Sequence, residues 1–322
     1  MQILFLGGTS FLGRHAAGVA VERGQEVTLF HRGSGPEDPF PEAEHLHGDR
    51  DGGLEVLRGR TWDAVIDTSG YVPRVVRQSA ELLRDRVRRY VFVSSISVYS
   101  ELADPVTEDG TPVAQLDDPA SEDVQADYGA LKAACERVVE EVYGDRSVRV
   151  RAGLIVGPYD PTDRFTYWPR RVAAGGDVLA PGKPDAPMQL VDARDLAAWL
   201  VRIAFDGPGG VFNATGPAEP ITFGELLERA RIAIGSDANF VWTEDERIVD
   251  AGVQPWTELP LWAPGHETHG LLRASIARAR AAGLDFRPLE ETVVDTLAWD
   301  RTEPGDRPTL ARDKEEEILA HA

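Results

Sequence analysis

The chain begins with Met1-Gln2-Ile3-Leu4-Phe5-Leu6-Gly7-Gly8-Thr9-Ser10-Phe11-Leu12-Gly13, a short apolar run that leads directly into a glycine-rich loop. The apolar run is too short to cross a bilayer and has no basic residues ahead of it, so it predicts a buried strand rather than a targeting segment. A helical pattern follows over residues 12–23. Strand, glycine loop and helix in this order form the first unit of many parallel α/β sheets.

The alternation of strand and helix continues through the first half of the chain. Strands are predicted at residues 3–6, 27–30, 64–67, 90–94 and 148–151, and helices at residues 12–23, 75–83 and 128–143. Because strands that are separated by helices connect through right-handed crossovers, this pattern predicts an α/β fold with a Rossmann-type, doubly wound parallel sheet. Such sheets bind ligands at the carboxyl ends of their strands.

The second half of the chain differs from the first in composition and in its pattern of predicted elements. Proline and glycine become frequent after residue 155, which predicts long loops. Helical patterns return at residues 194–205, 222–234, 271–282 and 289–300, and a peripheral helix is predicted in the charged tail, residues 302–322. We therefore expect a dinucleotide-binding Rossmann domain over 1–155. A smaller C-terminal substrate lobe should occupy most of 156–322, with some segments returning to the sheet.

Composition excludes several classes of partner. The net charge of −20 argues against nucleic acid, because binding to phosphates depends on lysine and arginine. No apolar run reaches the roughly 20 residues that a membrane span needs. The chain has one cysteine, Cys135, which cannot form an intramolecular disulfide and is expected to be a buried apolar residue. These features favour a cytoplasmic protein that acts on a small molecule.

The glycine loop is a candidate site for a pyrophosphate. It contains Gly7, Thr9, Ser10, Phe11, Leu12 and Gly13 and ends at the start of the first helix, whose free amide groups attract anions. Ser10 stands where a glycine is usual in dinucleotide-binding loops. An ordinary glycine-rich turn remains the alternative for this segment alone.

Other residues at strand ends are candidates for the rest of a dinucleotide site. His31 stands where an NAD-selective site carries an acidic residue, and Arg32 follows it. Since a guanidinium group suits a 2′-phosphate, NADP is the preferred cofactor, with NAD as the alternative. Asp49 is a candidate for the adenine end of the site. The segment Thr68-Ser69-Gly70 follows a strand and is expected to line the dinucleotide further along.

A tyrosine and a lysine four residues apart form the candidate catalytic pair. Tyr128 and Lys132 are predicted to share one face of a helix. A nearby ammonium group favours the phenolate, so Lys132 is expected to lower the pKa of Tyr128 and also to hold a ribose hydroxyl. Tyr128 would then exchange a proton with a substrate alcohol or carbonyl. The strand at 90–94 ends in serines, one of which can orient the reacting oxygen.

Together these motifs resemble the extended short-chain dehydrogenase/reductase family, and more narrowly its NAD-dependent epimerase/dehydratase group. The resemblance covers roughly residues 1–235 and rests on segments 7–13, 93–99, 128–132, 151–158 and 191–197. It implies a Rossmann domain with a C-terminal substrate lobe, and a homodimer. It also implies that Ser95 is the catalytic serine, Tyr128 the acid/base and Lys132 the ribose-binding cation.

Two departures from the family pattern keep a second hypothesis open. Ser10 and His31, together with the run His31-Arg32-Gly33, resemble a branch of the family that contains chloroplast stem-loop RNA-binding proteins. The alternative function is therefore a non-catalytic dinucleotide-sensing or RNA-binding protein on the same fold.

The sequence indicates less clearly which residues contact the substrate. Arg164, Tyr167 and Trp168 are candidate substrate contacts, because an arginine beside aromatic side chains can hold a sugar, base or phosphate. For Trp168 a packing role is an equal alternative. His266-Glu267-Thr268-His269 has the wrong spacing for a zinc helix, so no metal is expected. The sequence predicts an oxidoreductase or epimerase that acts on a hydroxyl or ketone of a sugar, nucleotide sugar or related small molecule.

Overall fold

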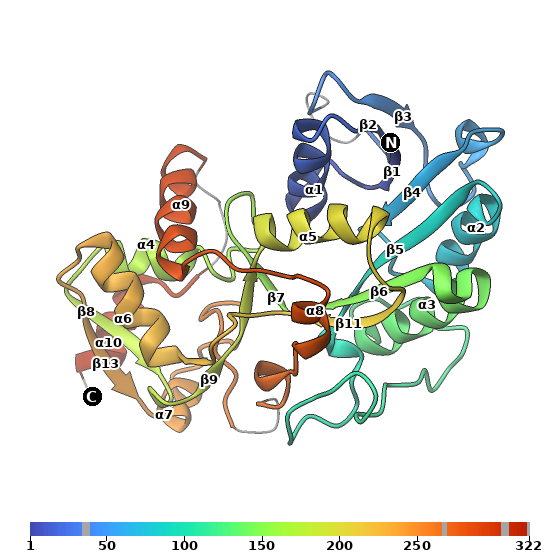
Figure 1. Cartoon of the computed structure of the whole chain (residues 1–322). Helices are drawn as coiled ribbons and strands as arrows, with labels where there is room; N and C mark the ends of the chain where they lie inside the picture. Colours follow the sequence, from blue (N-terminus) through green and yellow to red (C-terminus); the bar gives the residue numbers. More distant parts are fainter. Residues whose placement is uncertain (34–38, 266–268, 304–308, 321–322) are drawn as a thin grey trace.

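Seven parallel strands form the central sheet in the computed structural model, which describes residues 1–33, 39–265, 269–303 and 309–320 (Figure 1). The strand order is β11-β6-β5-β4-β1-β2-β3, and every neighbouring pair is parallel. The bounds are β1 (Gln2–Leu6), β2 (Glu26–His31), β3 (Glu44–His47), β4 (Trp62–Asp67), β5 (Val87–Ser95), β6 (Ser147–Ala152) and β11 (Gly210–Ala214). The order reverses between β1 and β4, which confirms the predicted Rossmann-type fold and places its ligand edge there.

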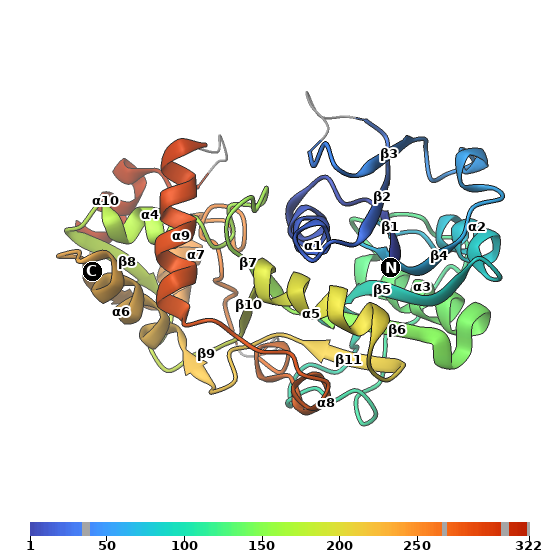
Figure 2. The same ribbon diagram turned by 45° about the horizontal axis from the view of Figure 1, so that its top comes forward.

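Helices cover both faces of the sheet, so its strands are buried on both sides. The first strand shows the pattern: Ile3 and Phe5 pack into one core cluster, and Leu4 and Leu6 into another, all four fully buried. The first cluster contains α1 (Phe11–Glu22) and α5 (Ala193–Phe205), and the second α2 (Pro73–Leu83) and α3 (Tyr128–Tyr143). The run of apolar residues in the strands therefore reflects burial between two helical layers (Figure 2).

The second lobe is built from short strand pairs and helices. The pairs are β7 (Leu154–Val156) with β10 (Leu190–Asp192), β8 (Asp177–Pro181) with β13 (Asn239–Thr243), and β9 (Pro187–Met188) with β12 (Ile221–Thr222). The helices are α4 (Tyr167–Ala173), α6 (Phe223–Ile234), α7 (Asp245–Asp250), α9 (Leu289–Thr302) and α10 (Arg312–Ala320). From this half of the chain, β11, α5 and α8 (Ala277–Ala281) belong to the first lobe, where β11 pairs with β6 and Ala279 of α8 lies in the core.

The helix predicted over residues 271–282 is wrong as a single element. The structure has a short 3-10 turn, Leu271–Arg273, and then α8 from Ala277. The backbone between them bonds to other segments: Ala274 N donates to Gln189 Oε1 at 2.8 Å, and Ser275 N donates to Val106 O at 2.9 Å. These amides are therefore engaged elsewhere and cannot join a continuous helical ladder.

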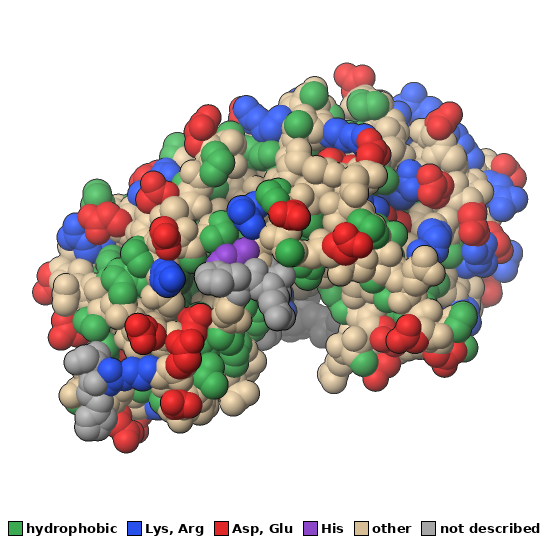
Figure 3. Space-filling model, turned by 90° about the horizontal axis from the view of Figure 1, so that it is seen from below, with side chains coloured by type: hydrophobic (Ala, Val, Ile, Leu, Met, Phe, Trp, Pro, Cys, Tyr) green, Lys and Arg blue, Asp and Glu red, His purple; other side chains and the backbone are tan. Residues whose placement is uncertain are grey.

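The surface of the molecule is mixed in charge. Seen from below, acidic and basic side chains alternate over it, and the molecule is hollowed between its two lobes (Figure 3). Among the described helices, none is both long and apolar enough to span a bilayer. Cys135 is fully buried in the cluster around α2 and α3, as predicted.

Candidate active site

The glycine loop between β1 and α1 is closely packed. Gly7 and Gly8 have φ angles of 107° and 95°, which side chains rarely adopt. A Cβ on Gly13 would lie 2.8 Å from Gly8 N and 2.9 Å from Gly8 Cα, so only glycine lets the helix approach the loop this closely. In the described structure, Ser10 begins α1 without a side-chain hydrogen bond to the helix and no acidic residue follows in the first turn. The helix start thus suits an anion.

The segment after β4 connects the glycine loop with α3. The hydroxyls of Thr68 and Ser69 donate to Leu6 O at 3.3 and 3.0 Å, which fixes the segment beside Gly7. The carbonyl oxygen of the next residue, Gly70, accepts a hydrogen bond from Lys132 Nζ at 2.7 Å. The structure therefore brings the predicted dinucleotide segment and the predicted lysine into direct contact.

Ser95 and Tyr128 meet at the end of β5. Ser95 is the last residue of that strand, and its Oγ lies 3.1 Å from Ser97 Oγ and accepts from Ser97 N at 3.1 Å. Tyr128 is the first residue of α3, and its phenol lies close enough to the Ser95 side chain for that side chain to lower the pKa of Tyr128. The helix lies close to this strand end because Gly129, which has no side chain, packs against the carbonyl of Ser97.

Electrostatics around Tyr128 differ from the expectation. Burial raises the pKa of Tyr128, while the Ser95 side chain and the charge of Arg164 lower it. From the sequence we expected the cation that lowers the pKa of Tyr128 to be Lys132. In the structure the cation with this effect is Arg164. The physical reason is direction, since the Lys132 ammonium points to two backbone carbonyls, Gly70 O and Val93 O at 2.7 and 2.6 Å.

Lys132 lies in a nearly closed site, 3% exposed. Its Nζ lies 5.0 Å from the ring centre of Tyr71 and 4.5 Å from that of Phe92. Burial lowers the pKa of Lys132 to about 8. Two of its three N–H groups reach the carbonyls named above, which leaves the third for a ligand hydroxyl.

Tyr71 is a site residue that the sequence did not indicate. Its ring centre is 6.5 Å from that of Tyr128, and the side chain is 45% exposed beside the candidate catalytic pair. The sequence carries a weak signal for it, because Tyr71 directly follows Gly70 at the carboxyl end of a buried strand.

The residues predicted to contact the adenosine part of the cofactor differ in their burial. His31 is buried between other histidines: its Nε2 lies 2.9 Å from His45 Nδ1, and its Nδ1 accepts from Gly33 N at 3.1 Å. His31 thus packs among histidines at the end of β2, and its contact with a ribose stays a prediction. Arg32 is exposed, and Asp49 is exposed and accepts from Asp51 N at 2.8 Å within a turn.

The three residues predicted to contact the substrate differ in their exposure to solvent. Arg164 is exposed and close enough to act on Tyr128. Tyr167 and Trp168 are 4% and 1% exposed, and Trp168 Nε1 donates to Pro260 O at 2.8 Å. Both rings belong to the core of the second lobe, where Trp168 packs on Phe223. The expectation that they contact substrate is corrected to a packing role.

A cavity of about 1010 Å³ lies in the second lobe. Its described lining includes Phe223, Trp256 and Trp262, one lysine (Lys183), and the carboxylates of Asp185, Glu244, Asp245, Glu246 and Asp250. Neither Ser95 nor Tyr128 lines this cavity, so it is not the reaction centre. It is bounded on one side by His269 and Leu272, and Gly270 between them donates to Leu102 O in the segment after β5.

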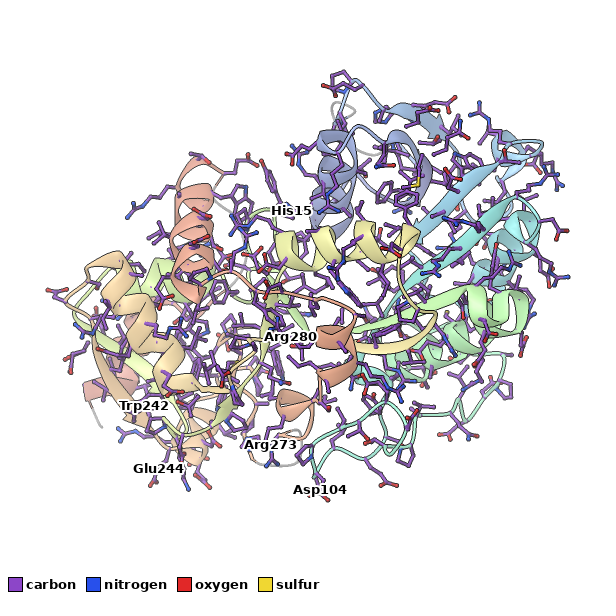
Figure 4. All side chains as sticks on the ribbon, viewed as in Figure 1. His15, Asp104, Trp242, Glu244, Arg273 and Arg280 are labelled. Atoms are coloured by element: carbon purple, nitrogen blue, oxygen red, sulfur yellow. The ribbon has the colours of Figure 1, made fainter. Side chains whose placement is uncertain are left out.

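Two contacts join the lobes near these features. Arg273 donates to Ala103 O at 3.2 Å, and Arg273 and Asp104 lie near each other, with Glu244 farther out on the second lobe (Figure 4). From α1, His15 points toward the second lobe, where its Nε2 lies 2.9 Å from Pro158 O (Figure 4). The start of α1 is therefore braced against the second lobe.

The sequence predicts no metal site, and most of the His266–His269 run, the segment weighed as a metal-binding motif, lies outside the residues that the structure describes. Residues 266–268 of the His266–His269 run are not among the described residues. Within the described residues, no group of three metal-ligating side chains comes together.

Part of the chain matches a known family, and two curated proteins are similar to most of it. Residues 72–214 match the NAD dependent epimerase/dehydratase family. The chain is 27% identical over 256 residues to the chloroplast stem-loop binding protein of 41 kDa b of Arabidopsis thaliana, which covers 73% of this chain and 63% of that protein. It is 26% identical over 245 residues to the isoflavone reductase homolog IRL of Zea mays, covering 70% and 72%.

Solved structures share the whole fold. The UDP-glucuronic acid 4-epimerase of Bacillus cereus, in complex with NAD, has a TM-score of 0.67 at 16% identity and covers 94% of this chain and 97% of that one. The Bordetella bronchiseptica enzyme WbmG, in complex with NAD, has a TM-score of 0.68 at 17% identity and covers 96% of each chain.

The family match extends over residues 72–214, and the family is the one that the sequence motifs resemble. The solved structures show that the fold is shared over nearly the whole chain.

Proposed function

We propose that the protein catalyses NAD(P)-dependent oxidation, reduction or epimerisation at a hydroxyl or carbonyl carbon of a sugar, nucleotide sugar or related small molecule. The observation that carries the proposal is the meeting of Ser95 and Tyr128 at the end of β5, with Lys132 beside them and bonded to Gly70. When bound, the nicotinamide group supplies or accepts a hydride. The cradle fits a dinucleotide, because Gly13 leaves space that any side chain would fill.

The residues divide the proton chemistry between them. Ser95 holds the reacting oxygen of the substrate toward Tyr128, whose phenol gives or takes the proton. Arg164 favours the phenolate through its charge, and so helps when Tyr128 acts as the base. Lys132 presents its remaining N–H to a ribose hydroxyl and so ties the dinucleotide to α3. Turnover is tested by following NAD(P)H absorbance with a panel of sugars, sugar alcohols and their nucleotide derivatives.

We propose Arg32 as the residue that selects NADP. Its exposed guanidinium follows β2 and can pair with a 2′-phosphate. Arg32→Ala is expected to weaken NADPH binding by roughly tenfold or more, which is about 1.4 kcal/mol, and to leave NADH binding nearly unchanged. Fluorescence titration with both reduced dinucleotides measures the two Kd values.

The control is Arg58→Ala, which removes another exposed arginine from a different loop and should change neither Kd. If wild-type protein binds NADH more tightly than NADPH, or if Arg32→Ala weakens both equally, Arg32 does not read the 2′-phosphate.

The acidic lining of the second-lobe cavity argues against substrates that would place a diphosphate group there. Because carboxylates outnumber the single lysine in the described lining, a diphosphate group should be repelled from this cavity. With the dinucleotide site saturated by NADP, UDP is therefore expected to bind wild-type protein only above roughly 1 mM, a binding free energy of about −4.1 kcal/mol. The double variant Glu244→Gln/Glu246→Gln should bind UDP more tightly, as isothermal titration calorimetry will measure.

The matched control is Glu291→Gln, which neutralises an exposed carboxylate on α9 outside the cavity lining. It should leave the UDP affinity at the wild-type value. Micromolar UDP binding by wild-type protein would reject the exclusion of diphosphates and favour a nucleotide sugar as substrate.

A non-catalytic RNA-binding function is the second candidate. It is favoured by one observation, the similarity to the chloroplast stem-loop binding protein. The net charge of −20 opposes it, because RNA affinity depends on cationic contacts. Binding of a stem-loop RNA at physiological salt, together with no turnover on the substrate panel, would replace the enzymatic proposal with this one.

Assembly and location are also proposals. We infer a homodimer from the family resemblance, which light scattering coupled to size-exclusion chromatography will test. The single buried cysteine, Cys135, fits a reducing compartment, and this supports a cytoplasmic location.

A further inference from the structure

A buried ion pair lies next to the proposed site and is not used in the proton chemistry. Arg50 follows β3, and its two terminal nitrogens donate to the two carboxylate oxygens of Asp67 at 2.5 Å each. The guanidinium also donates to Ser79 Oγ at 2.9 Å and reaches Tyr90 Oη at 3.3 Å. Arg50 is 9% exposed and Asp67 is fully buried, so the pair is almost closed to water.

The pair is connected to Lys132 through one short segment. Asp67 Oδ1 accepts from Ser69 N at 3.1 Å, and Arg50 itself reaches Ser69 Oγ at 3.4 Å. The next residue, Gly70, provides the carbonyl that receives the Lys132 ammonium at 2.7 Å. A continuous series of hydrogen bonds therefore runs from Arg50 through Asp67 and the Ser69–Gly70 turn to Lys132.

Stability alone gives little reason for this arrangement. A buried ion pair commonly contributes no more to folding than well-packed apolar residues of similar size. Without Arg50, Asp67 would keep the hydrogen bonds from Tyr90 Oη and Ser69 N, at 2.7 and 3.1 Å, but its charge would not be neutralised in the low-dielectric region beside Lys132. Arg50 neutralises that carboxylate and also fixes its orientation through two parallel hydrogen bonds.

We propose that Arg50 is a positioning residue for Lys132: through Asp67 it fixes the Ser69–Gly70 carbonyl that holds the ammonium, and it keeps the charge of Asp67 from acting on Lys132. The catalytic meaning of this role rests on the proposed function, since Lys132 is there the residue that binds the dinucleotide ribose. The physical claim about Lys132 needs neither substrate nor dinucleotide.

Charges on every neighbouring element determine the expected direction. The pKa of Lys132 is lowered to about 8; burial is the main cause, and the Arg50 cation acts in the same direction. Cys135 and Glu136 on α3 and Asp67 on β4 raise it. The aromatic rings of Tyr71 and Phe92 complete the surroundings. Loss of the Arg50 cation must therefore raise the pKa of Lys132, and loss of the Asp67 carboxylate must lower it.

The composition allows a direct measurement of this pKa. The chain contains three lysines, Lys132, Lys183 and Lys314, beside 31 arginines. Protein labelled with ¹³C at lysine Cε should therefore give three side-chain signals. Lys183→Arg and Lys314→Arg variants assign two of them and leave Lys132 as the third. Titration of the full-length protein between about pH 6.5 and 10.5 then reports the pKa of each lysine.

The test compares Arg50→Met and Asp67→Asn with the wild-type protein. Arg50→Met should raise the pKa of Lys132 by roughly half a unit or more, and Asp67→Asn should lower it, while Lys183 and Lys314 do not shift. Arg50→Lys keeps a cation beside Asp67, so it should restore most of the wild-type pKa of Lys132, which is read beside a fourth lysine signal from the new residue. An unchanged pKa in Arg50→Met, or equal shifts of all three lysines, would overturn the proposal.

The double variant Arg50→Met/Asp67→Asn guards against misfolding of the single variants, because it buries no unpaired charge. In this variant the two electrostatic effects on Lys132 oppose each other, so its pKa should lie between the values of the two single variants. Because the Ser69–Gly70 turn loses its anchor, the dinucleotide Kd should still rise, and a wild-type Kd in the double variant would also overturn the proposal. If the wild-type protein binds no dinucleotide, the proposed function fails, and the lysine titration still decides this inference.

Discussion

Replacement of Tyr128 by phenylalanine is expected to lower kcat by a factor of about 10²–10⁴, because it removes the proton-transfer group of the site. The ring remains, so the packing beside Tyr71 and the start of α3 should persist. Dinucleotide affinity should change by less than about twofold, since the ribose contact is assigned to Lys132. Steady-state kinetics on the substrate found in the panel, with a dinucleotide titration, measure both quantities.

Tyr143→Phe is the matched control for this prediction. It removes a phenol from the other end of α3, where the hydroxyl donates to Ala80 O at 3.1 Å, far along the helix from Ser95. It should leave kcat unchanged. Wild-type turnover in Tyr128→Phe would show that another group transfers the proton, with Tyr71 as the next phenol to replace.

Gly13→Ala is expected to have the largest effect on dinucleotide binding. The new methyl group would lie 2.8 Å from Gly8 N, so the backbone of the glycine loop or the start of α1 must shift. The Kd for the dinucleotide should rise by roughly tenfold or more, equivalent to about 1.4 kcal/mol. Overpacking should also reduce the free energy of unfolding by about 1–3 kcal/mol, which chemical denaturation will measure.

Gly18→Ala tests whether this effect belongs to the loop. The residue lies in the same helix, but its Cβ would meet only the ring edge of Phe40, at 3.3 Å and beyond. Alanine favours a helix over glycine by roughly 1 kcal/mol, so stability should hold or increase, and the Kd should not change. Equal loss of affinity in both variants would mean that α1 as a whole, rather than the Gly8–Gly13 contact, forms the site.

The sheet could be predicted well where the strands are buried on both faces. The apolar runs in β1, β4 and β5 are continuous because helices cover both sides, so their signal is strong. The edge strand β3 was missed, since Glu44-His45-Leu46-His47 contains one aliphatic residue. The break at residues 274–276 could not be predicted either, because it depends on bonds to Gln189 and Val106, distant in the sequence.

For the site residues too, positions that depend on the local sequence could be predicted, and those that depend on distant contacts could not. Ser95, Tyr128 and Lys132 lie at strand and helix ends, so local patterns in the sequence suffice to place them near one another. Arg50 and Tyr71 could not be assigned from the sequence, because their roles depend on contacts with Asp67 and α3.

Packing changed the assignment of two aromatic residues. The sequence marked Tyr167 and Trp168 as substrate contacts from residue type and position. Both rings lie in the core of the second lobe. Residue type alone does not distinguish an aromatic side chain that faces a ligand from one that fills a core.

Binding of a nicotinamide dinucleotide at the start of α1, next to Lys132, is the property on which the proposed chemistry depends. Native mass spectrometry of the purified protein, followed by titration with NADPH and NADH, measures this binding without knowledge of the substrate. We predict one dinucleotide bound per chain, with tighter binding of NADPH than of NADH. Failure of both dinucleotides to bind would contradict the proposed function.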